Sequence, residues 1–229
     1  MIIYYTTDFG DKTAILSDDQ YLHCAKVLRK KINDVVYVTN GAGALFEAQV
    51  DNISKKEVVL TINKTISQQS LAHKRQIAIA PTKNIDRFEW FLEKATEIGI
   101  TDIFPFLSAR SERKIIKPSR LEKIIVSAMK QSKNLYKPKL HPLMPLTKLL
   151  KSTDIVDQKF VAHCMDPDAK LNKLYKSESD AIVLIGPEGD FTKVEVATAI
   201  NDNWKEVSLG DSRLRTETAG LIACHILNL

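Results

Sequence analysis

Two short clusters in the last third of the sequence contain residue types that could hold a ligand. The first is the loop Gly186-Pro187-Glu188-Gly189-Asp190, which directly follows the apolar run 181–185. Glycines placed after a strand let backbone amides approach a ligand closely, as happens at the carboxyl ends of parallel strands. An ordinary tight turn has the same composition. The loop also lacks the lysine of a P-loop, which argues against a nucleoside triphosphate.

The second cluster runs from Leu209 to Ala219 and contains Arg215 and Glu217 among threonines, just before an apolar C-terminal stretch. Thr216, Glu217 and Thr218 can satisfy the first turn of a helix and compensate its dipole. Arg215 is different, because a cation at a helix N-terminus opposes the dipole. Its position indicates a bound anion or a carboxylate partner, and a residue that only braces the loop is the alternative.

The elements around these clusters alternate between strands and helices from about residue 76 onward. Short apolar runs predict strands at 77–80, 103–106, 160–162, 181–185 and 206–209. Helices are predicted after Asn84, from Pro118, behind a Thr192–Glu195 capping box, and from Ala219 onward. Alternation of this kind favours an α/β domain built on a parallel sheet.

The first 65 residues have a different pattern of apolar residues. Apolar runs predict short strands joined by turns at 2–5, 14–16, 35–39, 44–50 and 57–62, and residues 18–29 predict one helix. This pattern favours a small β-barrel or sandwich. A polar connector from Ser67 to Lys74 separates the two regimes. We therefore expect one domain over residues 1–70 and a second over residues 74–229.

Composition excludes several classes of protein. The chain has 229 residues, of which 44% are hydrophobic and 27% charged, and this balance is typical of a globular protein. No apolar run approaches the roughly 20 residues that cross a bilayer, and the start does not resemble a signal peptide, so we expect a cytoplasmic protein. Cys24, Cys164 and Cys224 are scattered without a CxxC pair. They predict reduced, mostly buried thiols, no disulfide framework and no metal site.

Positive charge is concentrated in one segment. Residues 110–139 contain ten Lys and Arg against two Asp and Glu, whereas the whole chain has a net charge of +5. Such a concentration favours binding to a polyanion, above all to the phosphates of a nucleic acid. A solvated helix face is the alternative, because charge runs of this kind are common.

The two C-terminal clusters together resemble a known family. IGPEGD at 185–190 followed by LGDSRLRTETA at 209–219 looks like the signature of the SPOUT methyltransferases, and further motifs resemble the ribosomal RNA small subunit methyltransferase E family. These motifs are HCAKVLR at 23–29, KATEIG at 94–99, Ser108 to Ser111, and Gln131-Ser132. The resemblance covers nearly the whole chain.

The resemblance implies a PUA-like β-barrel over residues 1–70 and an α/β domain with a C-terminal trefoil knot over residues 74–229. It implies a homodimer that uses S-adenosylmethionine to methylate N3 of a uridine in the 16S rRNA of the small ribosomal subunit. The implied cofactor-binding residues are Leu184, Ile185, Gly186, Pro187, Glu188, Gly189, Leu209, Gly210, Leu214, Thr216 and Thr218. Asp190 stands where the family more often has glycine, and Lys133-Asn134 replaces the usual Gly-Arg.

The resemblance also suggests roles for individual side chains. Arg215 would orient the base or stabilise its developing anion, and Glu217 would hold Arg215 or relay a proton. The expected RNA-binding residues are His23, Arg29, Lys30, Arg110, Arg113, Lys114, Lys117, Lys130 and Lys133. Two alternatives remain open. The chain could modify another RNA position, or it could be an assembly factor that binds RNA without catalysis.

Overall fold

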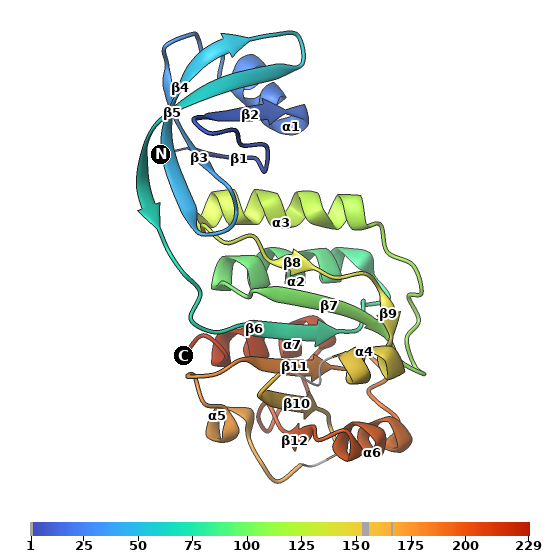
Figure 1. Cartoon of the computed structure of the whole chain (residues 1–229). Helices are drawn as coiled ribbons and strands as arrows, with labels where there is room; N and C mark the ends of the chain where they lie inside the picture. Colours follow the sequence, from blue (N-terminus) through green and yellow to red (C-terminus); the bar gives the residue numbers. More distant parts are fainter. Residues whose placement is uncertain (1, 153–155, 166) are drawn as a thin grey trace. The chain divides into compact units, whose positions relative to one another are not determined.

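The computed structural model describes residues 2–152, 156–165 and 167–229 (Figure 1). The chain folds into two compact units. The first comprises the residues up to Leu71 together with Met129–Lys137, and the second comprises Ala72–Ala128 and Pro138–Leu229. The boundaries expected from the sequence, at residues 70 and 74, did not include this return of residues 129–137 to the first unit.

The first unit is built on a five-stranded sheet. Its strands are β1 (Ile3–Tyr5), β2 (Thr13–Ser17), β3 (Val35–Thr39), β4 (Ala44–Ile53) and β5 (Glu57–Gln68), in the order β1-β3-β4-β5-β2. β1 and β3 are parallel, and the other pairs are antiparallel. The sheet surrounds a core of Tyr4, Leu16, Val38, Val50 and Leu60, all buried. Each strand predicted in this half of the sequence is present.

One predicted helix of the first unit has an unexpected form. A single turn of α-helix, α1 (Asp18–Tyr21), continues into a π-helical segment, η1 (Leu22–Val27). Cys24 in this segment is fully buried and contributes to the core. The wider π-helical turn changes which side chains face the core, so the α-helical periodicity of residues 18–29 did not predict it.

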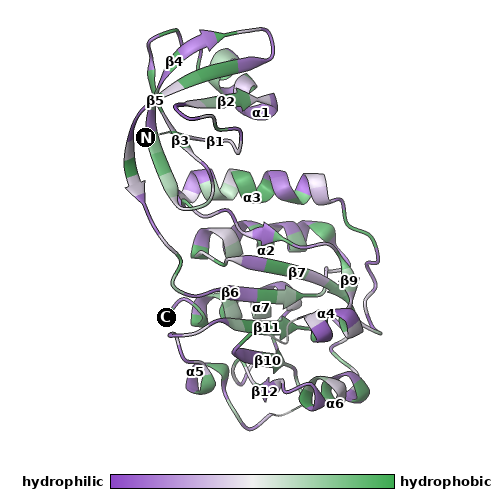
Figure 2. Ribbon diagram, viewed as in Figure 1, coloured by the Kyte–Doolittle hydropathy of each residue, from purple (hydrophilic) through white to green (hydrophobic). Residues whose placement is uncertain are grey.

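The second unit is built on a seven-stranded parallel sheet. Its strands are β6 (Arg75–Ile79), β7 (Asp102–Leu107), β8 (Lys139–Leu140), β9 (Met144–Pro145), β10 (Gln158–Ala162), β11 (Ala181–Ile185) and β12 (Lys205–Val207). Six of them run in the order β12-β10-β11-β6-β7-β8, and β9 pairs with β7. β11 is hydrophobic along its length, and β6 and β10 become hydrophobic after two polar residues at their starts (Figure 2). Such apolar runs are expected when both faces of a parallel sheet are covered.

Helices cover both faces of this sheet. On one face, Ile77, Ile103 and Val183 pack with α2 (Ile85–Ile98), α3 (Pro118–Ser132), α5 (Leu171–Leu174) and α7 (Thr216–Ile226). On the other face, Ala78, Phe104 and Leu184 pack with α4 (Leu146–Ser152) and α6 (Lys193–Asn201). The alternation of neighbouring residues between the two cores follows from the strand period of two.

Local signals in the sequence located three helix ends correctly. The Asn84 side chain accepts a hydrogen bond from the Asp86 amide at the start of α2, and Gly99 ends α2 with φ of 100°. Thr192 and Glu195 form both hydrogen bonds of the predicted capping box. α4, α5, β8 and β9 were not predicted from the sequence, because they are too short to show a clear period.

A half-buried pair of Asp102 and His141 holds the start of β7. The Asp102 carboxylate lies 2.9 Å from His141 Nε2 and accepts a 2.8 Å hydrogen bond from the Thr101 hydroxyl. Burial opposes ionisation of Asp102, but the hydrogen bonds from His141 and Thr101 outweigh it, so the pKa of Asp102 is lowered. The pair should therefore stabilise the fold above the ordinary carboxyl pKa of about 4 and lose this effect as the pH falls further.

We expect Asp102→Asn to lower the free energy of unfolding at pH 7 by about 1 to 3 kcal/mol, the scale for hydrogen bonds to a charged group. The variant should also lose less stability than the wild type when the pH is lowered from 5 to 3. Urea unfolding at several pH values measures both effects. Asp157→Asn, at an exposed position, is the control. An equal loss of unfolding free energy between pH 5 and pH 3 in wild type and Asp102→Asn would contradict this account.

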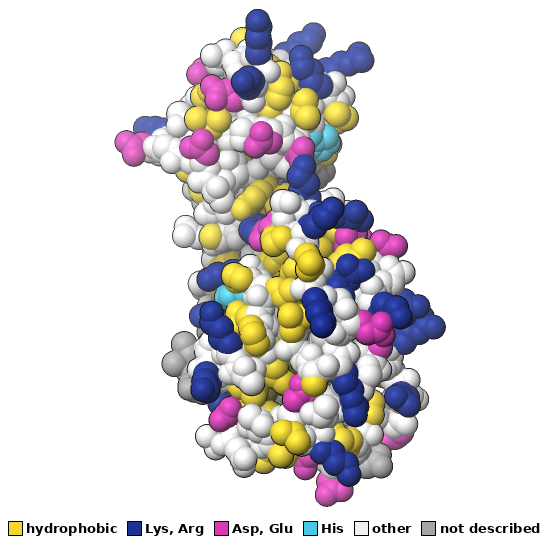
Figure 3. All heavy atoms as spheres, turned by 90° about the vertical axis from the view of Figure 1, so that its right-hand side faces the viewer, with side chains coloured by type: hydrophobic (Ala, Val, Ile, Leu, Met, Phe, Trp, Pro, Cys, Tyr) yellow, Lys and Arg dark blue, Asp and Glu magenta, His cyan; other side chains and the backbone are white. Residues whose placement is uncertain are grey.

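Figure 3 shows one face of the molecule, on which Lys and Arg side chains are scattered among hydrophobic, acidic and other side chains. In the part of the chain that is described, no helix is both long and apolar enough to span a bilayer. The same residues include no group of three or more His, Cys, Asp or Glu side chains that could hold a metal ion.

Candidate active site

A cavity of about 1090 Å³ opens where three neighbouring strands of the second unit end. Its walls are the loop after β10 (residues 162–165 and 167–170), the loop after β11 (residues 186–191, the GPEG loop) and the loop after β12 (residues 208–215, the arginine loop). Because β12, β10 and β11 are adjacent and parallel, their carboxyl ends meet at one edge. Ligands of open α/β sheets bind at such edges.

The cavity contains most of the residues expected to bind a cofactor. Every one of them lines it except Leu184, which is buried in β11, and Thr218, which lies further along α7. The loop after β10 was missed, although it supplies Ala162, His163 and Cys164. This loop has no glycine or motif of its own, so only the pairing of β10 with β11 could have indicated it.

The GPEG loop is held in place by its own carboxylates. Asp190 has φ of 59°, in the left-handed region that favours glycine. Its Oδ1 accepts a hydrogen bond from the Phe191 amide at 2.8 Å and its Oδ2 accepts one from the Cys164 amide at 2.9 Å. Glu188 Oε1 accepts a 2.8 Å hydrogen bond from the Lys83 amide. Asp190 therefore adopts a left-handed backbone angle and joins two walls of the cavity.

Close packing explains the two glycines of this loop. A Cβ atom on Gly186 would lie 3.0 Å from the Phe191 ring, and one on Gly189 would lie 3.3 Å from Arg110 side-chain carbons. The cavity is large enough for a nucleoside-sized molecule, and glycine backbone lines it at Gly186, Gly189 and Gly210. These residues fit a nucleoside cofactor bound largely through backbone groups.

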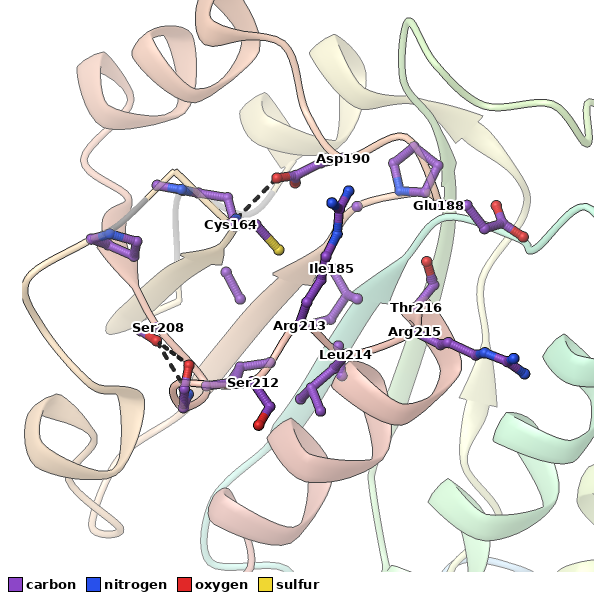
Figure 4. A pocket seen from close by; sticks show the side chains of 18 of the residues that line it. Cys164, Ile185, Glu188, Asp190, Ser208, Ser212, Arg213, Leu214, Arg215 and Thr216 are labelled. Atoms are coloured by element: carbon purple, nitrogen blue, oxygen red, sulfur yellow. Dashed lines mark hydrogen bonds between the residues drawn. The ribbon is translucent and has the colours of Figure 1, made fainter.

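The two arginines of the arginine loop point in different directions. Figure 4 shows Arg213 extending across the cavity toward Asp190, whereas Arg215 leaves the loop on the side of Glu188 and Thr216. Within the described residues, neither arginine forms an ion pair. Arg213 lies within the LGDSRLRTETA run, but no role was assigned to it from the sequence.

Glu217 does not pair with Arg215. It is 7% exposed, its Oε1 lies 3.8 Å from Arg87 Nε on α2, and its Oε2 is buried without a hydrogen-bond partner. Glu217 is also absent from the cavity lining. The predicted contact between the two site residues is therefore replaced by a contact between α7 and α2.

Comparison with known proteins gives two matching family models. Residues 69–228 match an RNA methyltransferase domain, and residues 16–63 match an RNA methyltransferase PUA domain. The first match alone covers more than half of the chain. A ribosomal RNA small subunit methyltransferase E from Rickettsia conorii is 28% identical over 229 residues, which cover 96% of this chain and 92% of that protein.

This chain belongs to the ribosomal RNA small subunit methyltransferase E family. A probable rRNA methyltransferase from Porphyromonas gingivalis has a similar structure, with a TM-score of 0.89 and 36% identity over 100% of this chain and 98% of that one. The family enzyme from Neisseria gonorrhoeae, solved with S-adenosylmethionine, has a TM-score of 0.84 and 25% identity over 98% and 95% of the two chains. The α/β fold and the PUA-like domain expected from the sequence are confirmed.

Several RNA-binding candidates of this family member already have partners within the chain. Arg110 Nη1 donates to the Gly189 carbonyl at 2.7 Å, and Arg113 Nη2 donates to the Lys83 carbonyl at 2.6 Å. Lys130 Nζ donates to Gln20 Oε1 at 3.0 Å, and burial lowers the pKa of Lys130. Burial, and secondarily Lys130, also lower the pKa of His23, which disfavours its cationic form.

Other RNA-binding candidates are open to solvent. Arg29, Lys114, Lys117 and Lys133 have exposed side chains, and Lys30 is half-buried. Lys114 and Lys117 lie in the loop that leads into α3, whereas the other three belong to the first unit. Fewer of the candidate cationic side chains are therefore available for phosphate contacts than the sequence indicated.

Proposed function

We propose that this chain methylates N3 of a uridine in 16S rRNA with S-adenosylmethionine as the methyl donor. The observation that carries the proposal is the cavity at the ends of β10, β11 and β12, which combines the GPEG loop with the arginine loop. The cofactor named for the Neisseria structure supports the choice of ligand. S-adenosylmethionine supplies an electrophilic methyl group from its sulfonium when it is bound.

The residues of this chain would contribute orientation and charge. Backbone groups of the GPEG and arginine loops would hold the donor, and alignment of donor and acceptor can contribute up to about 7 to 11 kcal/mol to catalysis. The transfer would form the N3–CH3 bond and break the S–CH3 bond, so that S-adenosylhomocysteine leaves. The N3 proton would pass to water, and a nearby guanidinium favours the resulting uracil anion. We assign this role to Arg215. Glu217, ion-paired with Arg87, would hold the start of α7 against α2.

Methylation of purified 16S rRNA and of isolated small subunits, followed by mass spectrometry of the nucleosides, tests the proposal. N3-methyluridine that appears only with active protein and donor is the expected product. A 2'-O-methylated nucleoside would instead indicate a different RNA position. Donor and RNA binding without any product would indicate a non-catalytic assembly factor.

We further propose a cytoplasmic homodimer with a knotted second unit and with its active sites near the dimer interface. Trp90 on α2 is 42% exposed and lies outside both cores of the second unit, so it is available for such an interface. Light scattering during size-exclusion chromatography measures the oligomeric state. A monomer at micromolar concentration would contradict the dimer.

Changing Lys114, Lys117 and Lys133 together to glutamine should weaken RNA binding. Each lost phosphate contact should reduce the slope of log affinity against log salt by up to about one unit, because fewer counterions are released. Affinity for S-adenosylmethionine should change little. The matched control replaces the exposed Lys55, Lys56 and Lys205 with glutamine. Equal salt slopes for both triple variants would mean that the basic segment is only a solvated surface.

A further inference from the structure

Arg110 connects two loops that are far apart in the sequence. It lies between β7 and α3, and its Nη1 donates to the Gly189 carbonyl at 2.7 Å and to the Phe191 carbonyl at 3.3 Å. Both acceptors belong to the GPEG loop, and Arg110 itself lines the cavity. Hydrogen bonds from a charged donor are stronger than those between neutral groups. The Arg110 guanidinium therefore binds the loop backbone, although the basic segment around it predicted a contact to RNA phosphate.

Packing strengthens this connection. A Cβ atom on Gly189 would lie 3.3 Å from both Cβ and Cδ of Arg110, so the aliphatic part of the arginine covers the glycine. Glycine leaves the loop with more backbone freedom than any other residue would. A hydrogen-bonded cation lying directly over Gly189 restricts that freedom at the point where the loop faces the cavity.

The backbone that carries Arg110 is itself anchored. The Ser108 amide donates to Ser111 Oγ at 3.0 Å, and the Ala109 amide donates to Glu195 Oε1 at 2.7 Å. Glu195 also forms the capping box with Thr192, directly after the GPEG loop. Arg110 therefore extends from a fixed turn, and the restraint that it places on the GPEG loop does not depend on another mobile segment.

Arg113 provides an internal comparison three residues further along. Its Nε donates to the Thr82 carbonyl at 2.9 Å and its Nη2 donates to the Lys83 carbonyl at 2.6 Å. The two arginines thus make the same kind of contact from the same loop. Arg110 contacts the GPEG loop directly, whereas Arg113 lies outside the cavity lining and reaches the loop only through Lys83, whose amide donates to Glu188.

We propose that Arg110 is a positioning residue that holds the GPEG loop in the shape that binds the cofactor, and that it is not a phosphate ligand for RNA. The inference rests on S-adenosylmethionine being the ligand of the cavity. Holding a loop in its bound conformation before the ligand arrives reduces the entropy lost on binding. Loss of the guanidinium should therefore weaken cofactor binding without removing a contact to RNA.

Arg110→Met tests the proposal, because methionine keeps an aliphatic side chain and removes every donor. The control is Arg120→Met, which changes an exposed arginine of α3 that pairs with Glu89 and does not line the cavity. Calorimetric titration should show S-adenosylmethionine bound about 10-fold more weakly by Arg110→Met, and within about twofold of wild type by Arg120→Met. This factor is that expected for one charge-assisted hydrogen bond at an exposed position. The salt slope of RNA binding by Arg110→Met should equal that of the wild type.

Two results would overturn the proposal. One is unchanged cofactor affinity in Arg110→Met, whether or not its melting temperature falls. The other is a salt slope of RNA binding about one unit shallower in Arg110→Met than in the wild type, which would make Arg110 an RNA contact whatever its cofactor affinity. Wild-type protein that does not bind S-adenosylmethionine would instead contradict the proposed function, so the two failures are distinguishable.

Discussion

Replacing Arg215 with alanine should lower the single-turnover methylation rate by about 100-fold or more, the usual scale for losing one group that stabilises transition-state charge. The affinities for cofactor and RNA should fall much less. Arg215 is the N-cap residue of α7, yet its side chain makes no capping hydrogen bond. The start of α7 therefore does not need its guanidinium, and within the described residues no carboxylate neutralises it.

Two further variants separate catalysis from bracing. Arg215→Lys keeps the charge and should retain part of the rate. Arg120→Ala removes an exposed arginine that pairs with Glu89 on α2, away from the cavity, and should react at nearly the wild-type rate. A melting curve is needed for each protein. A near-normal single-turnover methylation rate in folded Arg215→Ala protein would refute the catalytic role.

Replacing Gly186 with valine should weaken S-adenosylmethionine binding by about 100-fold or more. Even a Cβ atom at this position would lie 3.0 and 3.1 Å from two carbons of the Phe191 ring and 3.4 Å from Asp190 Oδ1. Phe191 is 2% exposed and stacks on Phe106, so it cannot move aside without disturbing the core. The branched side chain should therefore displace the GPEG loop, whose backbone lines the cavity.

Gly220→Ala is the control for a general loss of stability. Its Cβ atom would lie 2.7 Å from the Phe91 ring and 2.9 Å from Ile79 Cδ1, in the core of the same unit and outside the cavity lining. Both variants should melt at a lower temperature, but only Gly186→Val should lose cofactor affinity when folded. Calorimetry below the melting transition compares them. Equal cofactor affinity in the two variants would contradict a special role for Gly186.

The amino-acid sequence by itself determined most of the local structure. Short apolar runs predicted the longer strands, and the side chains of Asn84, Thr192 and Glu195 predicted two helix starts. These structures can be predicted from the sequence because the residues that interact are only a few positions apart. The GPEG and arginine loops were recognised in the same way, since each cluster is contiguous in the chain.

Only the tertiary structure determined the hydrogen-bond or ion-pair partner of each polar side chain. Arg110 and Arg113 were predicted to contact RNA phosphates because they lie in a basic segment. The fold instead brings backbone carbonyls of distant loops within hydrogen-bond distance of both. Glu217 stands two residues from Arg215, yet successive positions at a helix start face different directions, and it meets Arg87 instead. The loop after β10 entered the cavity for a similar reason, because strand order, which no local pattern encodes, placed β10 between β11 and β12.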